Sequence, residues 1–264
     1  QIGSKKLIKT VTQQQFQDYQ QALYTPDNTV ICLSGNFNEA STLEKIKHYF
    51  QMGQSTQSLK AEPIKEHNPE KKYIIENKQT EQAHMILGFK SLNLHDPRKY
   101  ALKVLATALG GNMSSRMFLN IREAQGLCYY IRTSSDLYSD CGSLQTKAGV
   151  DINRIPDAIQ SITREYQKAF QDGFTKEEVH KAKEYLKGKM VLNYEDTESV
   201  AHMHARQELL LDGLKSIDEI IAEFDKVTTE EVNQLAKDLL QLKNLYTYII
   251  GPCNEDELAP LLTF

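Results

Sequence analysis

An internal repeat constrains the fold of this chain more than any other feature. Residues 11–39 align without a gap on residues 227–255, and seven of the twenty-nine aligned positions are identical. Apolar positions coincide as well, because Phe16 and Tyr19 fall on Val232 and Leu235. Both copies show a capped helix, a turn, an apolar strand, a glycine and a second helix in the same order. Such a repeat predicts two similar structural units rather than one continuous domain.

The two copies differ in the length of chain that precedes them. About 156 residues, starting near Lys71, precede the second copy, whereas only ten precede the first. If the two units are equal in size, roughly 146 residues of a first domain are missing from this chain. We therefore expect the C-terminal remnant of a first domain at residues 1–52 and a complete second domain at 71–264. The Gly, Ser, Thr and Pro content of residues 53–70 predicts a linker between them.

Composition argues against several functional classes. The net charge is −4 with no block of like charges, which disfavours a nucleic-acid partner. No apolar run is long enough to span a membrane. The cysteines lack C-x-x-C spacing, so we expect free and mostly buried thiols at Cys32, Cys128, Cys141 and Cys253. Free thiols favour a reducing compartment such as the cytoplasm; no other sequence signal indicates the localisation.

The order of strand and helix patterns predicts the fold class α+β. Apolar runs predict strands over residues 29–34, 73–75, 83–89, 127–133, 143–150 and 245–250. Capping boxes predict helices that begin at Thr12, Thr175, Ser216 and Thr228. Apolar stripes predict further helices near residues 38, 97, 114, 155 and 198. Because strands and helices occur in blocks, we expect a two-layer fold in which a mixed or antiparallel sheet packs against helices.

The sequence carries no recognisable metal or nucleophile motif. His202, His204 and Glu208 form its densest cluster of possible ligands. On a helix, however, His202 points nearly opposite to the other two, and a zinc site needs at least three convergent ligands. H-x-x-E-H, H-E-x-x-H, G-x-S-x-G and phosphate-binding glycine motifs do not occur. We therefore expect no metal site in this chain.

One segment, residues 109–131, combines glycines, a cation and a phenol. It opens with Gly110, Gly111 and Asn112, which precede a helix that Ser114 is expected to cap. Within that helix the spacing of the apolar residues places Met117, Phe118 and Ile121 on the inward face.

The same segment ends at a corner between a helix and a strand. Arg122 lies near the helix end, Gly126 breaks the helix, and Tyr129 begins the next strand. Such a corner can bring a cation and a phenol to one point. Residue chemistry alone nevertheless favours a structural interpretation, with an arginine at a helix C-terminus and a tyrosine in the core.

This segment resembles the second-domain signature of the pitrilysin-like zinc metallopeptidases, in particular their bacterial and mitochondrial-processing-peptidase-like branch. That signature reads Gly-Gly-Gly-Met-Ser-Ser-Arg-Leu-Phe, then Ile-Arg-Glu, then Gly-Leu-Ala-Tyr. The resemblance covers essentially the whole chain, including residues 24–28 and 206–232. Asn112 and Cys128 depart from the signature, but neither departure removes Arg122 or Tyr129.

The resemblance implies a chain with two similar domains that face each other. The family's zinc-binding residues lie in the first domain, so zinc is expected in the full-length parent and not in this chain. By the same resemblance, Tyr129 donates to the developing oxyanion and Arg122 holds a peptide carbonyl. Gly110, Gly111 and Asn112 are the other expected substrate-binding residues.

We therefore expect the C-terminal half of a zinc endopeptidase, inactive by itself. Its expected partners are the N-terminal domain of its own parent chain, a peptide substrate, and a second subunit in a homo- or heterodimer. One alternative is a non-catalytic partner or core subunit of a peptidase complex that keeps the fold without a zinc motif. Another is a stand-alone peptide-binding module. An H-x-x-E-H motif encoded upstream would distinguish the first interpretation from the second.

Overall fold

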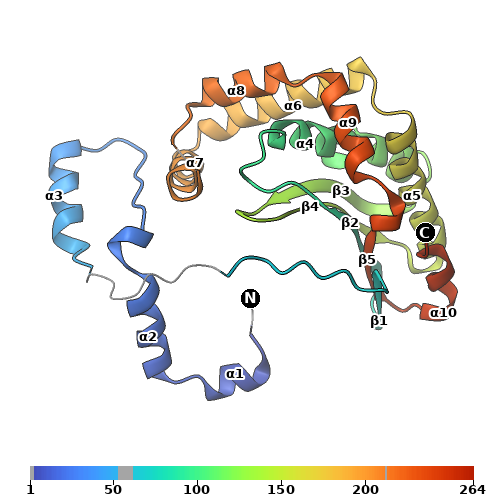
Figure 1. The fold of residues 1–264 in the computed structure, drawn as a ribbon, viewed down its shortest axis with the longest axis horizontal. Helices are drawn as coiled ribbons and strands as arrows, with labels where there is room; N and C mark the ends of the chain where they lie inside the picture. Colours follow the sequence, from blue (N-terminus) through green and yellow to red (C-terminus); the bar gives the residue numbers. More distant parts are fainter. Residues whose placement is uncertain (1–2, 53–61, 212) are drawn as a thin grey trace. The chain divides into compact units, whose positions relative to one another are not determined.

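The computed structural model describes residues 3–52, 62–211 and 213–264. The chain divides into two compact units, which are described separately here. The small unit consists of Gln1–Pro63 and Leu192–Lys215, and the large unit consists of Ile64–Val191 and Ser216–Phe264. Figure 1 shows the whole chain, coloured along the sequence. No helix among the described residues is long and apolar enough to cross a bilayer.

The large unit contains one five-stranded mixed sheet, which confirms the predicted α+β class. Its strands follow the order β1-β5-β2-β4-β3. The edge strand β1 runs parallel to β5, and all other neighbours are antiparallel. The strands are β1 Tyr73–Asn77, β2 Ala83–Lys90, β3 Cys128–Leu137, β4 Gly142–Val150 and β5 Tyr246–Gly251.

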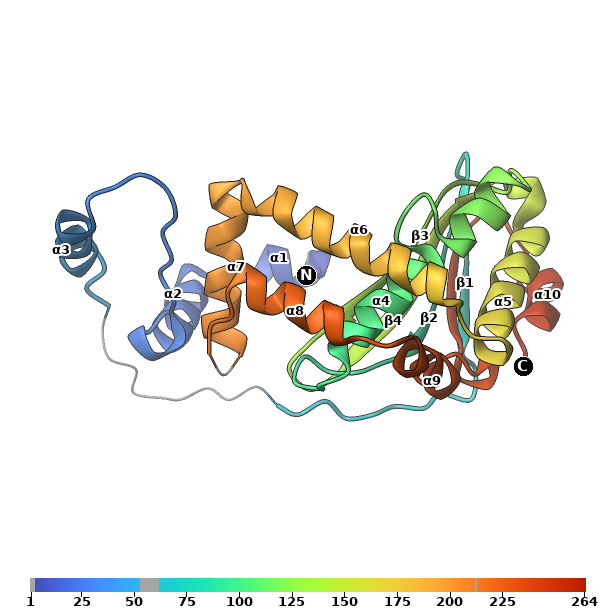
Figure 2. The same cartoon turned by 90° about the horizontal axis from the view of Figure 1, so that it is seen from above.

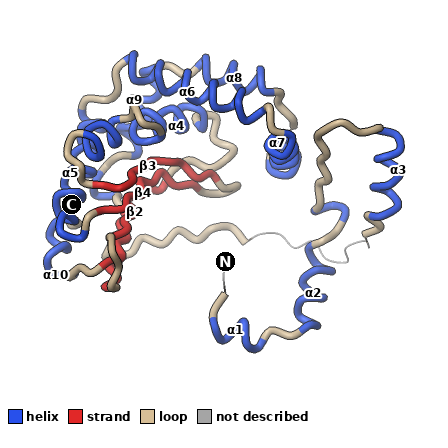
Figure 3. Tube along the Cα trace, turned by 180° about the vertical axis from the view of Figure 1, so that it is seen from behind, coloured by secondary structure: helices blue, strands red, loops and turns tan. Residues whose placement is uncertain are grey.

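Helices of the large unit cover one face of this sheet (Figure 1, Figure 3). Seen from above, α6 and α8 lie side by side (Figure 2). These helices are α4 Lys99–Ala106, α5 Ile155–Gln171, α6 Lys176–Tyr194, α8 Ile217–Lys226, α9 Thr229–Leu239 and α10 Glu255–Leu258. Short turns complete the unit: η2 Thr107–Gly111, η3 Phe118–Glu123, η4 Ile152–Arg154, η5 Leu242–Asn244 and η6 Ala259–Leu261.

The hydrophobic core lies between the sheet and these helices. Along β2, Met85 and Leu87 are buried while the intervening Ile86 is 37% exposed, as expected where only one face of a strand is covered. Tyr166 of α5 crosses the core: its ring meets Phe89 edge to face at 5.0 Å. Its hydroxyl donates to the carbonyl oxygen of Leu87 at 3.1 Å, so this buried phenol is satisfied.

The predicted capping boxes are confirmed. In each, the hydroxyl of the N-cap residue accepts from the backbone N–H three residues later, and the Glu or Gln at that position accepts from the N-cap N–H. The pairs are Thr12 with Gln15, Thr175 with Glu178, Ser216 with Glu219 and Thr228 with Glu231.

The small unit contains helices but no sheet among its described residues. Its elements are α1 Lys5–Thr10, α2 Gln13–Leu23, η1 Pro26–Asn28, α3 Glu39–Tyr49 and α7 Thr197–Leu210. None of its described hydrophobic side chains is buried. Phe16 and Tyr19 are 65% and 64% exposed, whereas their repeat counterparts Val232 and Leu235 are 0% and 2% exposed. The small unit therefore presents a core-forming pattern without a core.

The strand predicted over residues 29–34 is wrong for this structure: these residues form neither helix nor strand. The repeat explains why. Its second copy places the matching segment in β5, which is hydrogen-bonded to β1 on one side and β2 on the other. No described strand pairs with residues 29–34, and a strand without partners leaves its backbone groups unpaired.

The proposed division at residues 1–52, 53–70 and 71–264 stays a prediction. Residues 53–61 of the linker lie outside the described residues. Residues 62–70 carry no helix or strand, and the Ile64 N–H donates to Asp140 Oδ2 at 2.9 Å within the large unit. Compactness groups α7 with the small unit, although the sequence division placed it in the second domain.

Candidate functional site

Two short π-helical turns, η2 and η3, flank the glycine segment that the sequence singled out. η2 forms the end of the helix predicted from residue 97, and η3 replaces about half of the regular helix predicted from residue 114. Wide turns of this type are rare and are found frequently at functional sites. Gly110 lies directly against β3: a Cβ atom on it would come within 2.1 Å of Thr133 Oγ1 and 2.9 Å of the Thr133 nitrogen. Only glycine therefore allows this close approach.

Asn112 organises the connection between η2 and η3. Its Oδ1 accepts from the Ser114 N–H and from the Ser114 hydroxyl, both at 2.9 Å. Its own carbonyl oxygen accepts from Ser115 Oγ at 2.5 Å. The prediction that Ser114 caps the next helix is wrong, because its hydroxyl is bonded to Asn112 and η3 has no side-chain cap.

η3 anchors Arg122 at the surface. Met117, Phe118 and Ile121 are buried, as predicted. The Arg122 side chain is exposed, and its guanidinium carbon lies 4.8 Å from the centre of the Phe118 ring. Within the described part of the chain, this guanidinium makes no hydrogen bond or ion pair. Its N–H donors thus remain available to a ligand.

A glycine turn follows and leads into β3. Gly126 adopts a φ of +60°, which the left-handed region allows at low cost only for glycine. Its N–H donates to the Arg122 carbonyl at 3.1 Å, and the Leu127 N–H donates to Ile121 at 3.2 Å. This pattern closes the helix end and starts the strand one residue before Tyr129.

Tyr129 occupies an irregular position at the start of β3. Cys128 pairs with Val150 and Tyr130 pairs with Gly149, so the register shifts and Tyr129 has no partner across the ladder. Bulges of this kind re-aim a side chain and are over-represented next to active sites. Tyr129 is 60% exposed, and its hydroxyl has no hydrogen-bond partner among the described residues. The expectation of a core tyrosine is therefore wrong for Tyr129.

Its neighbour Tyr130 is engaged. The Tyr130 hydroxyl and His84 Nδ1 lie 3.1 Å apart across the sheet. The ring packs on Gly149, where an added Cβ would lie 2.4 Å from Tyr130 Cε1. His84 was not identified from the sequence, because a lone histidine in a strand carries no motif. Its proximity to Tyr130 depends on strand pairing.

Cys128, which directly precedes Tyr129, carries a buried thiol. Burial raises the pKa of its thiol to about 11, and the nearby positive charges of Arg122 and Arg154 only partly oppose that increase. All four cysteines are free, as expected, but only Cys128 is buried.

A cavity of about 460 Å³ brings together Gly110, Gly111 and Asn112, the remaining candidate residues. Arg122 and Tyr129 do not line it. Phe118 connects the two groups, because it lines the cavity and also supports the Arg122 guanidinium. The other lining residues, of which Arg132 and Tyr185 were missed from the sequence, are Met113, Ser114, Ile131, Arg132 and Tyr185.

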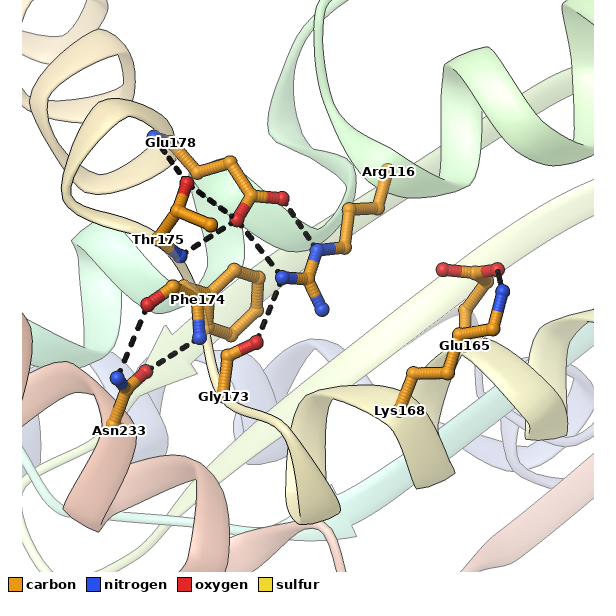
Figure 4. A network of polar contacts seen from close by, with 8 residues as sticks. All are labelled: Arg116, Glu165, Lys168, Gly173, Phe174, Thr175, Glu178 and Asn233. Atoms are coloured by element: carbon orange, nitrogen blue, oxygen red, sulfur yellow. Dashed lines mark hydrogen bonds and ion pairs between the residues drawn. The ribbon is translucent and has the colours of Figure 1, made fainter.

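A second arginine of the segment, Arg116, is engaged within the large unit. Its Nε and one terminal nitrogen bind the Glu178 carboxylate at 2.5 and 2.8 Å, and that same terminal nitrogen donates to the Gly173 carbonyl at 2.7 Å (Figure 4). Its guanidinium also stacks on Phe174, 4.3 Å from the ring centre. Arg116, which lies two residues before η3, therefore ties this segment to the start of α6, whereas Arg122 has no such partner in the described part of the chain.

No group of three or more His, Cys, Asp and Glu side chains among the described residues is arranged to hold a metal ion. His202 lies 3.8 Å from Glu198 on the same helix, and both side chains are more than 80% exposed. This arrangement is an exposed pair on a helix, and it does not fit a zinc site.

Comparison with known proteins gives a consistent result. Residues 10–186 match the family model described as the peptidase M16 inactive domain. The chain is 34% identical over 238 residues to an uncharacterized zinc protease of Bacillus subtilis, covering 90% of this chain and 58% of that protein. It is 30% identical to an uncharacterized zinc protease of Mycobacterium leprae, covering 98% of this chain and 59% of that protein.

Solved structures agree at the level of the fold. A peptidase M16 inactive domain from Pseudomonas fluorescens superposes with a TM-score of 0.84 at 18% identity, covering 96% of this chain and 60% of that one. The chain thus spans less than two thirds of the length of these relatives.

Proposed function

This chain belongs to the M16 peptidase family, as its inactive domain, and we propose that it is the substrate-holding C-terminal half of a zinc-dependent endopeptidase. The family match confirms the resemblance to pitrilysin-like metallopeptidases. Relatives that align with 90% and 98% of this chain carry the name zinc protease. The described residues do not fit a zinc ion. In this proposal the zinc, which would supply Lewis-acid chemistry, is held by a preceding domain, and this chain alone is inactive.

One observation carries the proposal. Arg122 and Tyr129 present donors to solvent from the corner between η3 and β3, and neither side chain has a hydrogen-bond or ion-pair partner among the described residues. Arg116 is ion-paired with Glu178, and the hydroxyls of Tyr130 and Tyr166 have partners. Exposed donors on a packed scaffold are preorganised for a ligand that brings acceptors. A peptide backbone has such acceptors in its carbonyl oxygens.

Different roles follow for the two side chains. Tyr129 donates its phenolic proton in a hydrogen bond to the carbonyl oxygen that gains negative charge during amide cleavage. Arg122 binds a neighbouring peptide carbonyl and positions the substrate. Gly110, Gly111 and Asn112 line the neighbouring cavity, which Phe118 connects to Arg122. The absence of side chains at the two glycines lets a peptide backbone approach closely.

The small unit supports the proposed partner. Residues 29–34 match a central strand of the large unit but have no described partner strand, and Phe16 and Tyr19 are exposed where their counterparts are buried. We infer that the preceding domain of the parent chain supplies both the missing strands and the covering core. Assembly as a homo- or heterodimer remains a further proposal.

The test compares variants of the full-length parent on a quenched peptide substrate. We expect Tyr129→Phe to lower kcat by about 10²–10³-fold, the usual cost of losing one oxyanion donor. Zinc content and thermal unfolding should not change, because only a solvent-exposed hydroxyl is lost. We expect Arg122→Ala to raise KM with little change in kcat if it binds the ground state and the transition state equally.

Tyr130→Phe is the matched control, because it removes the same atom from the adjacent tyrosine, whose hydroxyl lies against His84. It should retain kcat. A normal kcat for Tyr129→Phe, or loss of kcat only in Tyr130→Phe, would contradict the assignment. If the parent gene encodes no H-x-x-E-H motif upstream, the non-catalytic core subunit becomes the better proposal.

A further inference from the structure

A second cavity, of about 440 Å³, lies between η3, α5 and the start of α6 in the large unit. It shares only Asn112 and Ser114 with the cavity at the candidate site. Its volume falls within the range of small-molecule sites. Four carboxylates and three cationic side chains line it, so its wall carries a formal charge of −1.

Three ion pairs account for every cation in this wall. Arg116 binds Glu178 at 2.5 Å, Lys168 binds one oxygen of Glu165 at 3.1 Å, and Lys181 binds Glu177 at 2.7 Å. Asp172 is the carboxylate left over, and no described residue forms a hydrogen bond or ion pair with its side chain.

Glu165 supplies a second unpaired acceptor. The residue is only 4% exposed, and its Oε2 has no hydrogen-bond partner among the described residues. In Figure 4 the second carboxylate oxygen of Glu165 points away from the Lys168 ammonium. A buried carboxylate oxygen without a donor costs free energy. Glu165 Oε2 therefore remains an acceptor that no described donor satisfies.

The two acceptors lie on one face of α5. Glu165, Lys168 and Asp172 follow the spacing i, i+3, i+7, which places Glu165 and Asp172 two turns apart, about 10 Å along the axis. Asp172 is the C-cap residue of α5, where the helix dipole also favours positive charge. A cation is thus favoured at both ends of this stripe.

The opposite charge is disfavoured in this cavity. The N-terminus of α6 would attract an anion, but its capping box already occupies it: the Thr175 N–H donates to Glu178 and the Glu178 N–H donates to Thr175. Arg116 is neutralised by the same carboxylate. No unpaired cation of the wall remains for an anionic ligand.

From these observations we propose that the cavity binds a small organic cation with two amino ends, one at the Glu165 carboxylate and one at Asp172. The class is that of the short aliphatic diamines. A lysine side chain offers a single ammonium of the same chemistry, and the experiment separates it from the free diamine. This site is independent of the peptidase proposal, because it requires neither zinc nor the preceding domain.

The test is calorimetric titration of the 264-residue chain with 1,4-diaminobutane in an amine-free buffer. We expect saturable one-to-one binding. 1-Aminobutane should bind at least tenfold more weakly because it has one ammonium, and 1,4-butanediol should not bind. Nα-Acetyl-lysine amide should resemble 1-aminobutane; if it binds more tightly than the diamine, the assignment to a free diamine is overturned.

Variants locate the site. Glu165→Gln keeps the shape and should weaken binding about tenfold or more, and Asp172→Asn, which changes an exposed residue, provides a second measurement that does not depend on core folding. Glu184→Gln on α6 is the control, because Glu184 pairs with Lys187 and does not line the cavity; it should bind normally. Wild-type affinity in both Glu165→Gln and Asp172→Asn would overturn the proposal, as would a crystal soaked in the diamine that shows only water at Glu165.

Discussion

Identical residue types in this domain have different roles, and their surroundings decide which. Arg116 donates to the Glu178 carboxylate and to the Gly173 carbonyl. Arg122, six residues later, makes no polar contact among the described residues. Three tyrosines differ in the same way. The buried Tyr166 hydroxyl and the surface Tyr130 hydroxyl have hydrogen-bond partners, whereas the exposed Tyr129 hydroxyl has none among the described residues. In each comparison the candidate residue is the one whose donors have no partner among the described residues.

At the residue scale, we predict that Cys128 resists alkylation. Burial holds the pKa of its thiol at about 11, so at pH 8 its thiolate fraction is about 100-fold or more below that of an ordinary thiol. Iodoacetamide labelling followed by mass spectrometry should therefore show slow alkylation of Cys128 in the folded chain. The same cysteine in guanidinium chloride is the control and should react normally. Rapid labelling of Cys128 in the folded chain would contradict its burial.

The raised pKa also predicts how stability depends on pH. Between about pH 9 and 11 the unfolded chain loses the Cys128 proton first, so the folded state holds more protons. The free energy of unfolding should therefore fall as the pH rises through this window, and Cys128 contributes no pH dependence below it. Urea unfolding of wild type and Cys128→Ser at pH 8 and pH 10 checks this: the difference between them should change with pH.

At the scale of elements, the close contact between η2 and β3 positions the glycine segment. The contact between Gly110 and Thr133 brings the wall of the cavity against the strand that carries Tyr129. The bulge at Tyr129 and the left-handed Gly126 then set where β3 starts. Three local irregularities in about twenty residues thus position the candidate site, and each breaks a regular helix or strand.

We predict that Gly110→Ala destabilises the large unit by about 1–3 kcal/mol or more, the usual cost of overpacking. The added Cβ would meet the Thr133 backbone nitrogen at 2.9 Å, so rotation of a side chain cannot relieve the clash. Gly188→Ala in the middle of α6 is the matched control. Nothing lies within 4 Å of its Cβ position, so it should stabilise α6 by about 0.5–1 kcal/mol. Urea unfolding followed by circular dichroism measures both, and an unchanged midpoint for Gly110→Ala would refute the close packing.

At the scale of the whole molecule, the two units differ in how much core each possesses. Every buried hydrophobic side chain among the described residues belongs to the large unit. Burial of a Leu or Val side chain contributes about 1.5–3 kcal/mol, so nearly all of the hydrophobic stabilisation lies in that unit. The small unit has capped helices whose apolar faces remain exposed, which agrees with a domain completed by other parts of the parent chain.

We predict that limited proteolysis cuts first on the N-terminal side of Ile64 and leaves a resistant fragment that contains the large unit. Ile64 is bonded to Asp140, and Lys90 Nζ donates to Asn68 Oδ1 at 2.9 Å, so protection should begin near this point. The described residues before Ile64 contain no buried hydrophobic side chain, and exposed segments of this kind are cut most readily. N-terminal sequencing of the early fragments identifies the cuts. Early cleavage within residues 97–125, with residues 3–63 intact, would contradict this division.

Local sequence patterns determined much of this protein. Alternating apolar runs located β2, β4 and β5, capping boxes located the starts of four helices, and the residues from Gly110 to Tyr129 indicated the family. These features depend on residues within a few positions of each other, so their physical cause is present in the chain itself.

Tertiary structure decided the rest, because it depends on which distant segments meet. Residues 29–34 have the composition of a strand but lack a described partner. The register shift at Tyr129, the contact of Tyr130 with His84 and the unpaired Glu165 oxygen arise only when strands and helices pack. Backbone pairing and burial are set by long-range contacts. The sequence therefore gives no reason to distinguish Tyr129 from Tyr130, whereas the fold leaves one exposed and pairs the other with His84.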